Sequence, residues 1–306
     1  MNLYTLTSSR LQEINPKPFK LEKEIQSLVE ENLNMLFGLD MICTEFPLDA
    51  LRIDTLAFDP ESKAFVIVEY KRGHSYSVVD QGYSYLSLLL NNKADFVLEY
   101  FERTGNPLRK QDVDWSQSRV IFISPEFSKY QMQSIEFKDL PFELWEIKRY
   151  SNNTVSFRQH KSSSRESIKT IEKRDDEAKK VDKEIVVYTE EDHYQKANNT
   201  IRELAEQLRD RIMELEGLEV NPVKQYIGFK YNKKLVCDFE VQKKQLRLRI
   251  NLKKGMLDDP KGLFRDVSNI GTFGVGDYEA VVNEKTDLDY LMSLVKVGYR
   301  YHAGSA

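Results

Sequence analysis

Three residues in the first half of the chain carry the side chains that phosphodiester hydrolysis needs: Asp54, Glu69 and Lys71. Hydrolysing this bond near neutral pH requires a group that holds a divalent cation, a group that activates water and a positive charge beside the phosphorus oxygens. Two carboxylates and one lysine meet these requirements. We therefore take the three residues as a candidate site, provided that the chain brings them together.

The two acids lie on neighbouring segments that are typical of strands. LRIDTLAFD and FVIVEYKR are short apolar runs, and Asp59-Pro60-Glu61-Ser62 between them has proline in the second position of a turn. A hairpin that turns between Asp59 and Lys63 places Asp54 near Glu69. Glu69 and Lys71 are two positions apart and therefore project from the same face of their strand.

These acids suit a hard cation that prefers oxygen ligands, and we expect Mg²⁺ or Mn²⁺. Asp54 and Glu69 supply side-chain ligands, and the main-chain carbonyl of Tyr70 is a further candidate ligand. Lys71 is expected to position the attacking water or to stabilise the developing negative charge.

Helices are predicted on either side of this hairpin. Apolar residues recur at helical spacing in LEKEIQSLVEENLNMLFGL, and Gly38 gives this segment a C-terminal stop. Ser77 and Asp80 form a capping-box pattern at the start of VVDQGYSYLSLLL, which predicts a second helix. Three apolar runs of strand length follow: ADFVLEY, SRVIFIS and FELWEIKRY. The sum is an α/β domain.

The segments RIDTLAFD and VIVEYK resemble the motif of the PD-(D/E)xK nuclease superfamily, with Ile53 in place of the proline in its name. Gln81 and Tyr85, in QGYSY on the second helix, match the Q-x-x-x-Y signature of RecB-like members. Over about residues 20 to 100, the chain resembles the branch that contains archaeal and actinobacterial mismatch-specific endonucleases. The resemblance implies a restriction-endonuclease-like core, a mixed sheet flanked by helices, with metal-dependent nuclease activity.

The resemblance also implies roles for residues beyond the central three. Gln81, as a catalytic residue, and Tyr85, as a substrate-binding one, are expected to contact the lysine, the metal-bound water or the backbone phosphates. The family acid usually lies near the start of the first helix, which makes Glu24 the first choice for a further metal ligand. Glu31 lies two turns later on nearly the same face and is the alternative, with a substrate contact as its expected role. Glu30 is expected on the solvated face.

The segment from His160 to Glu184 mixes many charged residues with few apolar ones. This composition buries too little surface to offset the entropy of ordering, which predicts a solvated linker or an exposed helix. We place a charged linker at residues 160–189, between a nuclease-like domain at 1–159 and a second domain at 190–306. Two domains agree with the length expected at ~150 residues per domain.

The second domain is predicted to be α+β. NNTIRELAEQLRDRIMEL and TDLDYLMSLVKVGYRY have helical patterns, and Thr286 with Asp289 suggests a capping box at the start of the latter. This half resembles an uncharacterised C-terminal domain that is recognised by GTFGVGDYEAVV followed by DLDYLMSLVKVGY. The resemblance implies no particular activity for this half.

Basic residues between these two helices raise the question of nucleic-acid contact. A hairpin that turns at Lys243-Lys244 places Glu240 opposite Arg247 and Asp238 opposite Arg249. Such cross-strand pairs neutralise part of the basic patch. They favour a paired, solvated sheet face over a contact with nucleic acid.

Bulk properties narrow the class of protein. With a formal net charge of -4, the chain lacks the surplus of Lys and Arg that coats nucleic acid nonspecifically, whereas an acidic metal site agrees with that charge. Cys43 and Cys237, with 4 histidines, supply too few ligands for a disulfide framework or a zinc cluster. No apolar run is long enough for a signal peptide or a membrane span, so a cytoplasmic protein is expected.

We therefore expect a Mg²⁺- or Mn²⁺-dependent nuclease that acts on nucleic acid, with DNA preferred, in repair, restriction or defence. No membrane partner is expected, and a homodimer is compatible with this function. The alternative is a noncatalytic nucleic-acid-binding or assembly module that retains the nuclease scaffold.

Overall fold

The computed structural model describes residues 3–48, 51–72, 77–162, 164, 166–170, 175–270 and 275–304. The chain folds as two units, Met1–Val187 and Tyr188–Ala306, and each has its own sheet and hydrophobic core. Within the described residues, every helix is too short or too polar to span a membrane.

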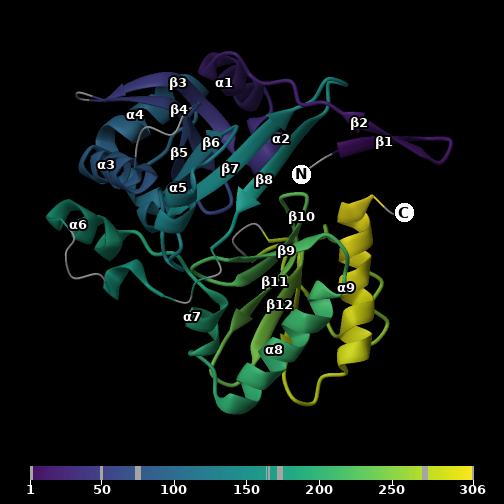
Figure 1. Cartoon of the computed structure of the whole chain (residues 1–306). Coiled ribbons are helices and arrows are strands. Elements are labelled where there is room, and N and C mark those ends of the chain that lie inside the picture. The colour runs from purple at the N-terminus through teal and green to yellow at the C-terminus, as the bar shows by residue number, and fades with distance from the viewer. Residues whose placement is uncertain are drawn as a thin grey trace. The chain divides into compact units, whose positions relative to one another are not determined.

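A six-stranded mixed sheet in the order β3-β4-β5-β6-β7-β8 forms the centre of the first unit (Figure 1). β5, β6 and β7 are parallel to one another, and the other neighbouring strands are antiparallel. All seven residues of β5 are buried, which explains the continuous apolar run FVIV. The strands are β3 (Asp40–Leu48), β4 (Leu51–Asp59), β5 (Ala64–Tyr70), β6 (Arg119–Ser124), β7 (Phe142–Arg149) and β8 (Val155–His160).

Helices cover both faces of this sheet, which confirms the predicted mixed sheet flanked by helices. α1 (Glu22–Glu31) and α2 (Leu33–Phe37) pack on the face that carries Val66, Val68 and Tyr70 of β5. The opposite face of β5, with Phe65 and Ile67, packs in the core that includes the remaining helices. These are α3 (Val78–Asn91), α4 (Lys93–Thr104), α5 (Lys129–Ser134) and α6 (Asp176–Glu184).

The predicted hairpin is confirmed by the register of β4 and β5, which runs from Asp59↔Ala64 to Thr55↔Val68. Asp59 closes the turn, because its Oδ1 accepts the main-chain N–H groups of Glu61 and Ser62. α3 also begins as predicted: the Ser77 side chain accepts the Asp80 N–H at the helix start.

The prediction of a strand at ADFVLEY is wrong, because this segment forms α4. Phe96 and Tyr100 are one helical turn apart, and both rings contact Phe65. Gly105, at φ 69°, takes the left-handed conformation that ends the helix. The apolar residues thus follow helical spacing, and the length of the run alone did not distinguish this from a strand.

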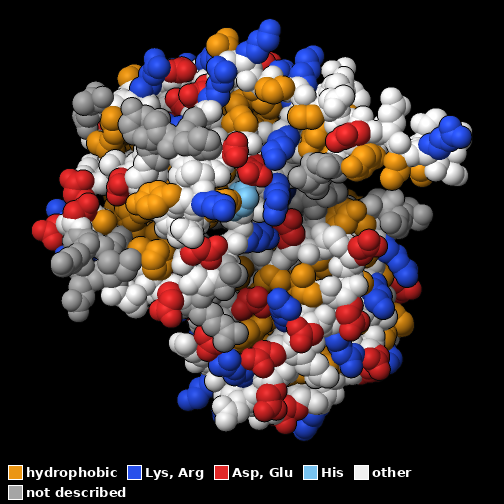
Figure 2. All heavy atoms as spheres, viewed as in Figure 1, with side chains coloured by type: hydrophobic (Ala, Val, Ile, Leu, Met, Phe, Trp, Pro, Cys, Tyr) orange, Lys and Arg blue, Asp and Glu red, His pale blue; other side chains and the backbone are white. Residues whose placement is uncertain are grey.

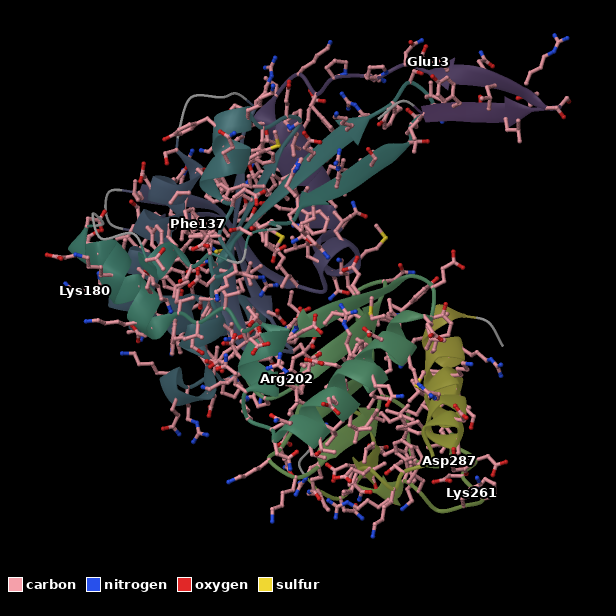
Figure 3. The ribbon with its side chains drawn as sticks, turned by 60° about the horizontal axis from the view of Figure 1, so that its bottom comes forward. Glu13, Phe137, Lys180, Arg202, Lys261 and Asp287 are labelled. Atoms are coloured by element: carbon pink, nitrogen blue, oxygen red, sulfur yellow. The ribbon has the colours of Figure 1, made fainter. Side chains whose placement is uncertain are left out.

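Most of the segment predicted as a charged linker belongs to the first unit, so the predicted boundary at residue 159 is too early. α6 buries Ala178 and Val181, and Ile185 follows them into the same core. Tyr83 on α3 donates to Asp182 at 2.9 Å. Lys180 points away from the unit (Figure 3). Although α6 has few apolar residues, it stays in this unit because they pack against an apolar surface of α3.

Further short elements complete the first unit. β1 (Leu3–Thr7) and β2 (Arg10–Ile14) form a separate two-stranded sheet. Between the longer elements lie the 3-10 turns η1 (Lys110–Asp112), η2 (Trp115–Gln117) and η3 (Ile168–Thr170).

The second unit is α+β, as predicted, with an antiparallel sheet in the order β13-β14-β12-β11-β10-β9. α8 (Asn199–Met213) and α9 (Leu288–Ala303) lie together in Figure 1 and pack on one face of it, and the short α7 (Glu190–Tyr194) precedes them. The strands are β9 (Leu218–Pro222), β10 (Ile227–Tyr231), β11 (Lys234–Val241), β12 (Leu246–Ile250), β13 (Arg265–Asp266) and β14 (Tyr278–Val282).

The cap of α9 differs by one residue from the prediction. Asp287, rather than Thr286, accepts the N–H of Tyr290 at the helix start. Asp287 also pairs with Lys261 at 3.2 Å, and the two side chains lie together in Figure 3. Residues 271–274 of the motif GTFGVGDYEAVV lie outside the described residues.

Candidate active site

The candidate site lies where β4 and β5 separate. Their register ends at Thr55↔Val68, and Asp54 and Glu69 are the next residues on the two strands. Beyond this pair, Asp54 Oδ2 accepts the main-chain N–H of Tyr70 at 3.0 Å, so a carboxylate occupies the place of a ladder carbonyl. We call this separation the fork. It brings Asp54 and Glu69 together, as the hairpin predicted.

Glu69 accepts hydrogen bonds from Lys71, which directly follows β5, and from two side chains of α3. Its Oε1 accepts Lys71 Nζ at 2.8 Å and Gln81 Nε2 at 2.9 Å, and its Oε2 accepts the Tyr85 hydroxyl at 2.9 Å. Gln81 Nε2 also lies 3.2 Å from the Tyr85 oxygen. Gln81 and Tyr85 can meet one carboxylate because residues four apart on a helix lie on the same face.

Burial and neighbouring charges shift the pKa values of Asp54 and Tyr85. Burial first, and then the neighbouring Glu69 charge, raises the pKa of Asp54 to about 6. The Tyr70 N–H and the Lys71 charge act in the opposite direction. Burial and the Glu69 carboxylate also raise the pKa of Tyr85, which keeps its hydroxyl protonated as the donor to Glu69. Two carboxylates in one partly dry site repel each other unless a cation lies between them.

The carboxylate oxygens of this pair are of the kind that Mg²⁺ and Mn²⁺ prefer. Mg²⁺ is commonly held by one or two carboxylates and keeps several of its waters, and Asp54 and Glu69 are two such groups. Asp54 Oδ1 accepts no hydrogen bond from the described part of the chain. Among the described residues, no three His, Cys, Asp or Glu side chains are grouped as a complete protein-only metal site.

Neither predicted helix acid reaches this pair. Glu24 accepts the Lys20 N–H and pairs with Arg149 at 3.0 Å, and Glu31 is exposed. α1 packs on the face of the sheet opposite α3, whereas Glu69 points toward α3. The assignments of Glu24 as a metal ligand and of Glu31 as a substrate contact are therefore not supported by where these side chains lie.

Three residues that the sequence did not indicate lie beside the fork. Gln26 is buried on α1, and its amide donates to the main-chain carbonyl of Asp54 at 2.9 Å. Glu30, expected on a solvated face, accepts the Thr55 hydroxyl at 2.6 Å. Glu45 on β3 contributes to the raised pKa of Asp54 and has φ 55°, a conformation that is uncommon for glutamate. No local sequence pattern predicts this backbone conformation of Glu45.

Tyr70 has contacts both within the fork and on the α1 face of the sheet. Its N–H reaches Asp54, while its buried hydroxyl lies 3.1 Å from that of Thr55 on the α1 side. Burial raises the pKa of this phenol. Its carbonyl as a metal ligand stays a prediction.

The predicted cross-strand pairs of the second unit are present. Asp238 lies opposite Arg249 and Glu240 opposite Arg247. Asp238 and Arg249 are buried, however, rather than solvated, and Arg249 Nε donates to Asp238 Oδ1 at 2.9 Å. The face of this unit seen in Figure 2 mixes acidic and basic side chains without a single-sign patch.

Comparisons with known proteins give the following matches. A family model described as a domain of unknown function, DUF5655, matches residues 190–302, in agreement with the resemblance noted for the second half. An uncharacterized protein of Haemophilus influenzae is 47% identical over 298 residues, which are 97% of this chain and 98% of that protein.

Three solved structures show low similarity. A repair endonuclease from Pyrococcus abyssi has a TM-score of 0.24 and 20% identity, with 39% of this chain and 44% of that chain covered. A complex of EndoMS with double-stranded DNA has a TM-score of 0.28 and 18% identity, over 42% and 47%. SfsA of Pyrococcus furiosus with Ca²⁺ has 0.25 and 14%, over 50% and 77%. These TM-scores and identities are too low to show a shared fold or activity.

Proposed function

The chain belongs to the same protein family as the uncharacterized Haemophilus influenzae protein, and we propose that its first unit is a metal-dependent nuclease that hydrolyses phosphodiester bonds. The observation that supports this proposal most is the grouping of Asp54, Glu69 and Lys71 at the fork, with Gln81 and Tyr85 on the same carboxylate.

Asp54 and Glu69 would hold Mg²⁺ or Mn²⁺ through carboxylate oxygens. The bound cation supplies a more acidic water and offsets negative charge on the phosphate. Gln81 and Tyr85 donate to Glu69 and hold it in one orientation, and a carboxylate fixed in this way loses less entropy when it binds. Lys71, two positions from Glu69, places an ammonium group at the mouth of the fork.

The role of Lys71 follows from its charge and its position. In the resting arrangement it pairs with Glu69 and offsets part of the repulsion between the two acids. With a phosphodiester present, its ammonium would orient the attacking water or stabilise charge on the phosphorus oxygens. DNA is the proposed substrate because RIDTLAFD, VIVEYK and QGYSY resemble motifs of DNA nucleases.

A cleavage assay with a substrate panel tests this proposal. Purified protein and Glu69→Gln are incubated with labelled single-stranded, double-stranded, mismatched and flapped DNA, and with RNA, in Mg²⁺, Mn²⁺ or EDTA. We expect cleavage of at least one DNA by the wild type alone, and none in EDTA. Equal cleavage by Glu69→Gln would place the activity elsewhere.

The Lys71–Glu69 ion pair of 2.8 Å favours a second candidate function, a noncatalytic nucleic-acid-binding or assembly module. In that function the pair is permanent and replaces the cation. A crystal soaked in Mn²⁺ distinguishes the two: density between Asp54 and Glu69 supports the enzyme, and an intact ion pair without density supports the binding module.

A further inference from the structure

Strand pairing is interrupted at Asp54 on both sides of β4, and main-chain polar groups that lose a strand partner must be satisfied elsewhere. Among the described residues of β3 and β5, none is paired in register with Asp54. Its main-chain carbonyl accepts Gln26 Nε2 at 2.9 Å, from the opposite side of the sheet to Glu69, and the Thr44 hydroxyl at the longer distance of 3.5 Å. Gln26 is 4% exposed, so this bond is sheltered from water.

The Gln26 amide is itself held in place. Its Nε2 lies 2.9 Å from the Thr44 hydroxyl on β3 and 3.0 Å from the Glu30 carboxylate one helical turn away. Its Oε1 accepts Lys23 Nζ at 3.2 Å. Every polar atom of this amide is therefore used, which fixes its orientation and with it the carbonyl of Asp54.

The same network reaches Tyr70 on the second strand of the fork. Glu30 accepts the Thr55 hydroxyl at 2.6 Å, which uses the only hydrogen of that group. The Tyr70 hydroxyl, 3.1 Å away, must then donate to Thr55. Thr55 and Tyr70 are the chain neighbours of Asp54 and Glu69, respectively. α1 thus holds both strands of the fork at the residues beside the two acids.

We propose that Gln26, supported by Glu30, is a positioning residue that sets the location of Asp54 relative to Glu69, an inference that rests on the proposed nuclease function. The Gln26 amide contacts the main chain of Asp54 rather than the two carboxylates, and it acts through that main chain. If position 26 served stability alone, an apolar side chain there, beside Ile25 and Val29, would be buried at a lower free-energy cost than an amide. The buried Gln26 amide, with its hydrogen bonds satisfied, instead holds the β4 main chain at Asp54 in one geometry.

The test compares Gln26→Met, which keeps the side-chain length but donates no hydrogen bond, with Val29→Ala. Val29 is fully buried on the same helix, in the apolar cluster on this face of the sheet, so its truncation destabilises α1 without removing a hydrogen bond from the fork. Gln26→Asn is the milder companion variant, because its amide is one methylene too short to keep the bond to Asp54. All three are measured in the full chain.

The primary readout is hydrogen exchange of the Tyr70 amide, which donates to the Asp54 side chain. Labelling with ¹⁵N-tyrosine gives 16 signals in the full chain, and Tyr70→Phe assigns the one that matters. We expect exchange to be about tenfold faster in Gln26→Met and Gln26→Asn than in Val29→Ala, because a local hydrogen bond is loosened. Equal exchange in the three variants would overturn the proposal.

The second readout is Mn²⁺ affinity by titration calorimetry without substrate. We expect both Gln26 variants to bind Mn²⁺ about 10- to 100-fold more weakly than the wild type, and Val29→Ala to bind normally. Unchanged affinity in both Gln26 variants would contradict the positioning role. A third outcome is that the wild type binds no Mn²⁺ while exchange of the Tyr70 amide is still faster in the Gln26 variants. That outcome would contradict the proposed nuclease function but would support the positioning of the fork by Gln26.

Discussion

Asp54 and Tyr70 are joined across the fork by a hydrogen bond of 3.0 Å, in which the Tyr70 main-chain N–H donates to Asp54 Oδ2. In a regular antiparallel pair, that N–H would donate to a main-chain carbonyl. Because a side chain takes this place, the strands separate and Asp54 stays beside Glu69. One carboxylate thus shapes the fork and, in the proposed function, binds the cation.

Replacing Asp54 with asparagine is expected to stabilise the metal-free protein at pH 8. The folded state raises the pKa of Asp54 from 3.8 to about 6, so the folded protein binds the proton more tightly than the unfolded chain. Stability is therefore lost as the pH rises through this interval, and the full loss is present above it. The substituted amide still accepts the Tyr70 N–H through its oxygen. We expect a gain of about 2 kcal/mol, less than the ~3 kcal/mol that the full shift corresponds to, because Asp54 is only partly buried and solvent screens its charge. Urea unfolding in EDTA measures it. A gain that does not shrink by pH 5 would contradict this cause.

Two tyrosines on α3 provide a matched pair for the role of Glu69. Tyr85→Phe removes the donor to Glu69 Oε2, and we expect cleavage to fall about 10- to 100-fold. Tyr83→Phe removes a donor to Asp182, which lies on α6 and away from the fork, and we expect activity to be kept. Initial rates under saturating Mg²⁺ give the comparison. A similar loss in both variants would mean that the whole helix, rather than the bond to Glu69, was disturbed.

The buried pair of Arg249 and Asp238 is expected to matter for stability and not for nucleic-acid binding. Arg249→Gln leaves a buried carboxylate without its cation, which typically costs about 3–5 kcal/mol. Arg249→Met combined with Asp238→Leu removes both charges, and most of the loss should be recovered. Arg211→Gln, whose partner Asp289 is exposed, should cost at most ~1 kcal/mol. Chemical denaturation provides the values, and a wild-type-like Arg249→Gln would refute the burial argument.

His193 gives the second unit a dependence on pH. Its Nε2 lies 2.7 Å from the Val223 carbonyl, and burial, followed by the charge of Lys196, lowers the pKa of the ring. A histidine with a lowered pKa contributes stability that is complete above the unfolded value of ~6.5 and is lost as the pH falls below it. We expect His193→Gln to lack this loss. Parallel stability curves for the two proteins between pH 7 and 5 would show that another group is responsible.

Several parts of the site follow from the sequence because they depend on local rules. The turn at Asp59-Pro60-Glu61-Ser62 fixed the register that brings Asp54 to Glu69, since strand pairing follows from turn position. Gln81 and Tyr85 share a face because they are four residues apart on a helix. The pairing of Asp238 with Arg249 follows in the same way from the turn at Lys243-Lys244.

Other parts depend on how distant elements pack, and no local pattern encodes that. Glu24, Glu30 and Glu31 are all acids of one helix, and only the orientation of α1 on the sheet decides that Glu30 lies toward Thr55. Gln26 has no special spacing to Asp54 along the chain. The segment at 160–189 is charged enough to predict a linker, yet four of its apolar residues, Ile168, Ala178, Val181 and Ile185, are buried in the core of the first unit.

The most direct test of a nuclease site at the fork separates the roles of Asp54 and Lys71. Mn²⁺ binding by calorimetry and DNA cleavage are measured on the wild type, Asp54→Asn and Lys71→Ala. We expect the wild type to bind and cleave, Asp54→Asn to lose both, and Lys71→Ala to bind Mn²⁺ while its turnover falls about 10² to 10³-fold. If the wild type cleaves and both variants cleave equally well, the activity does not come from the fork and the site is wrong.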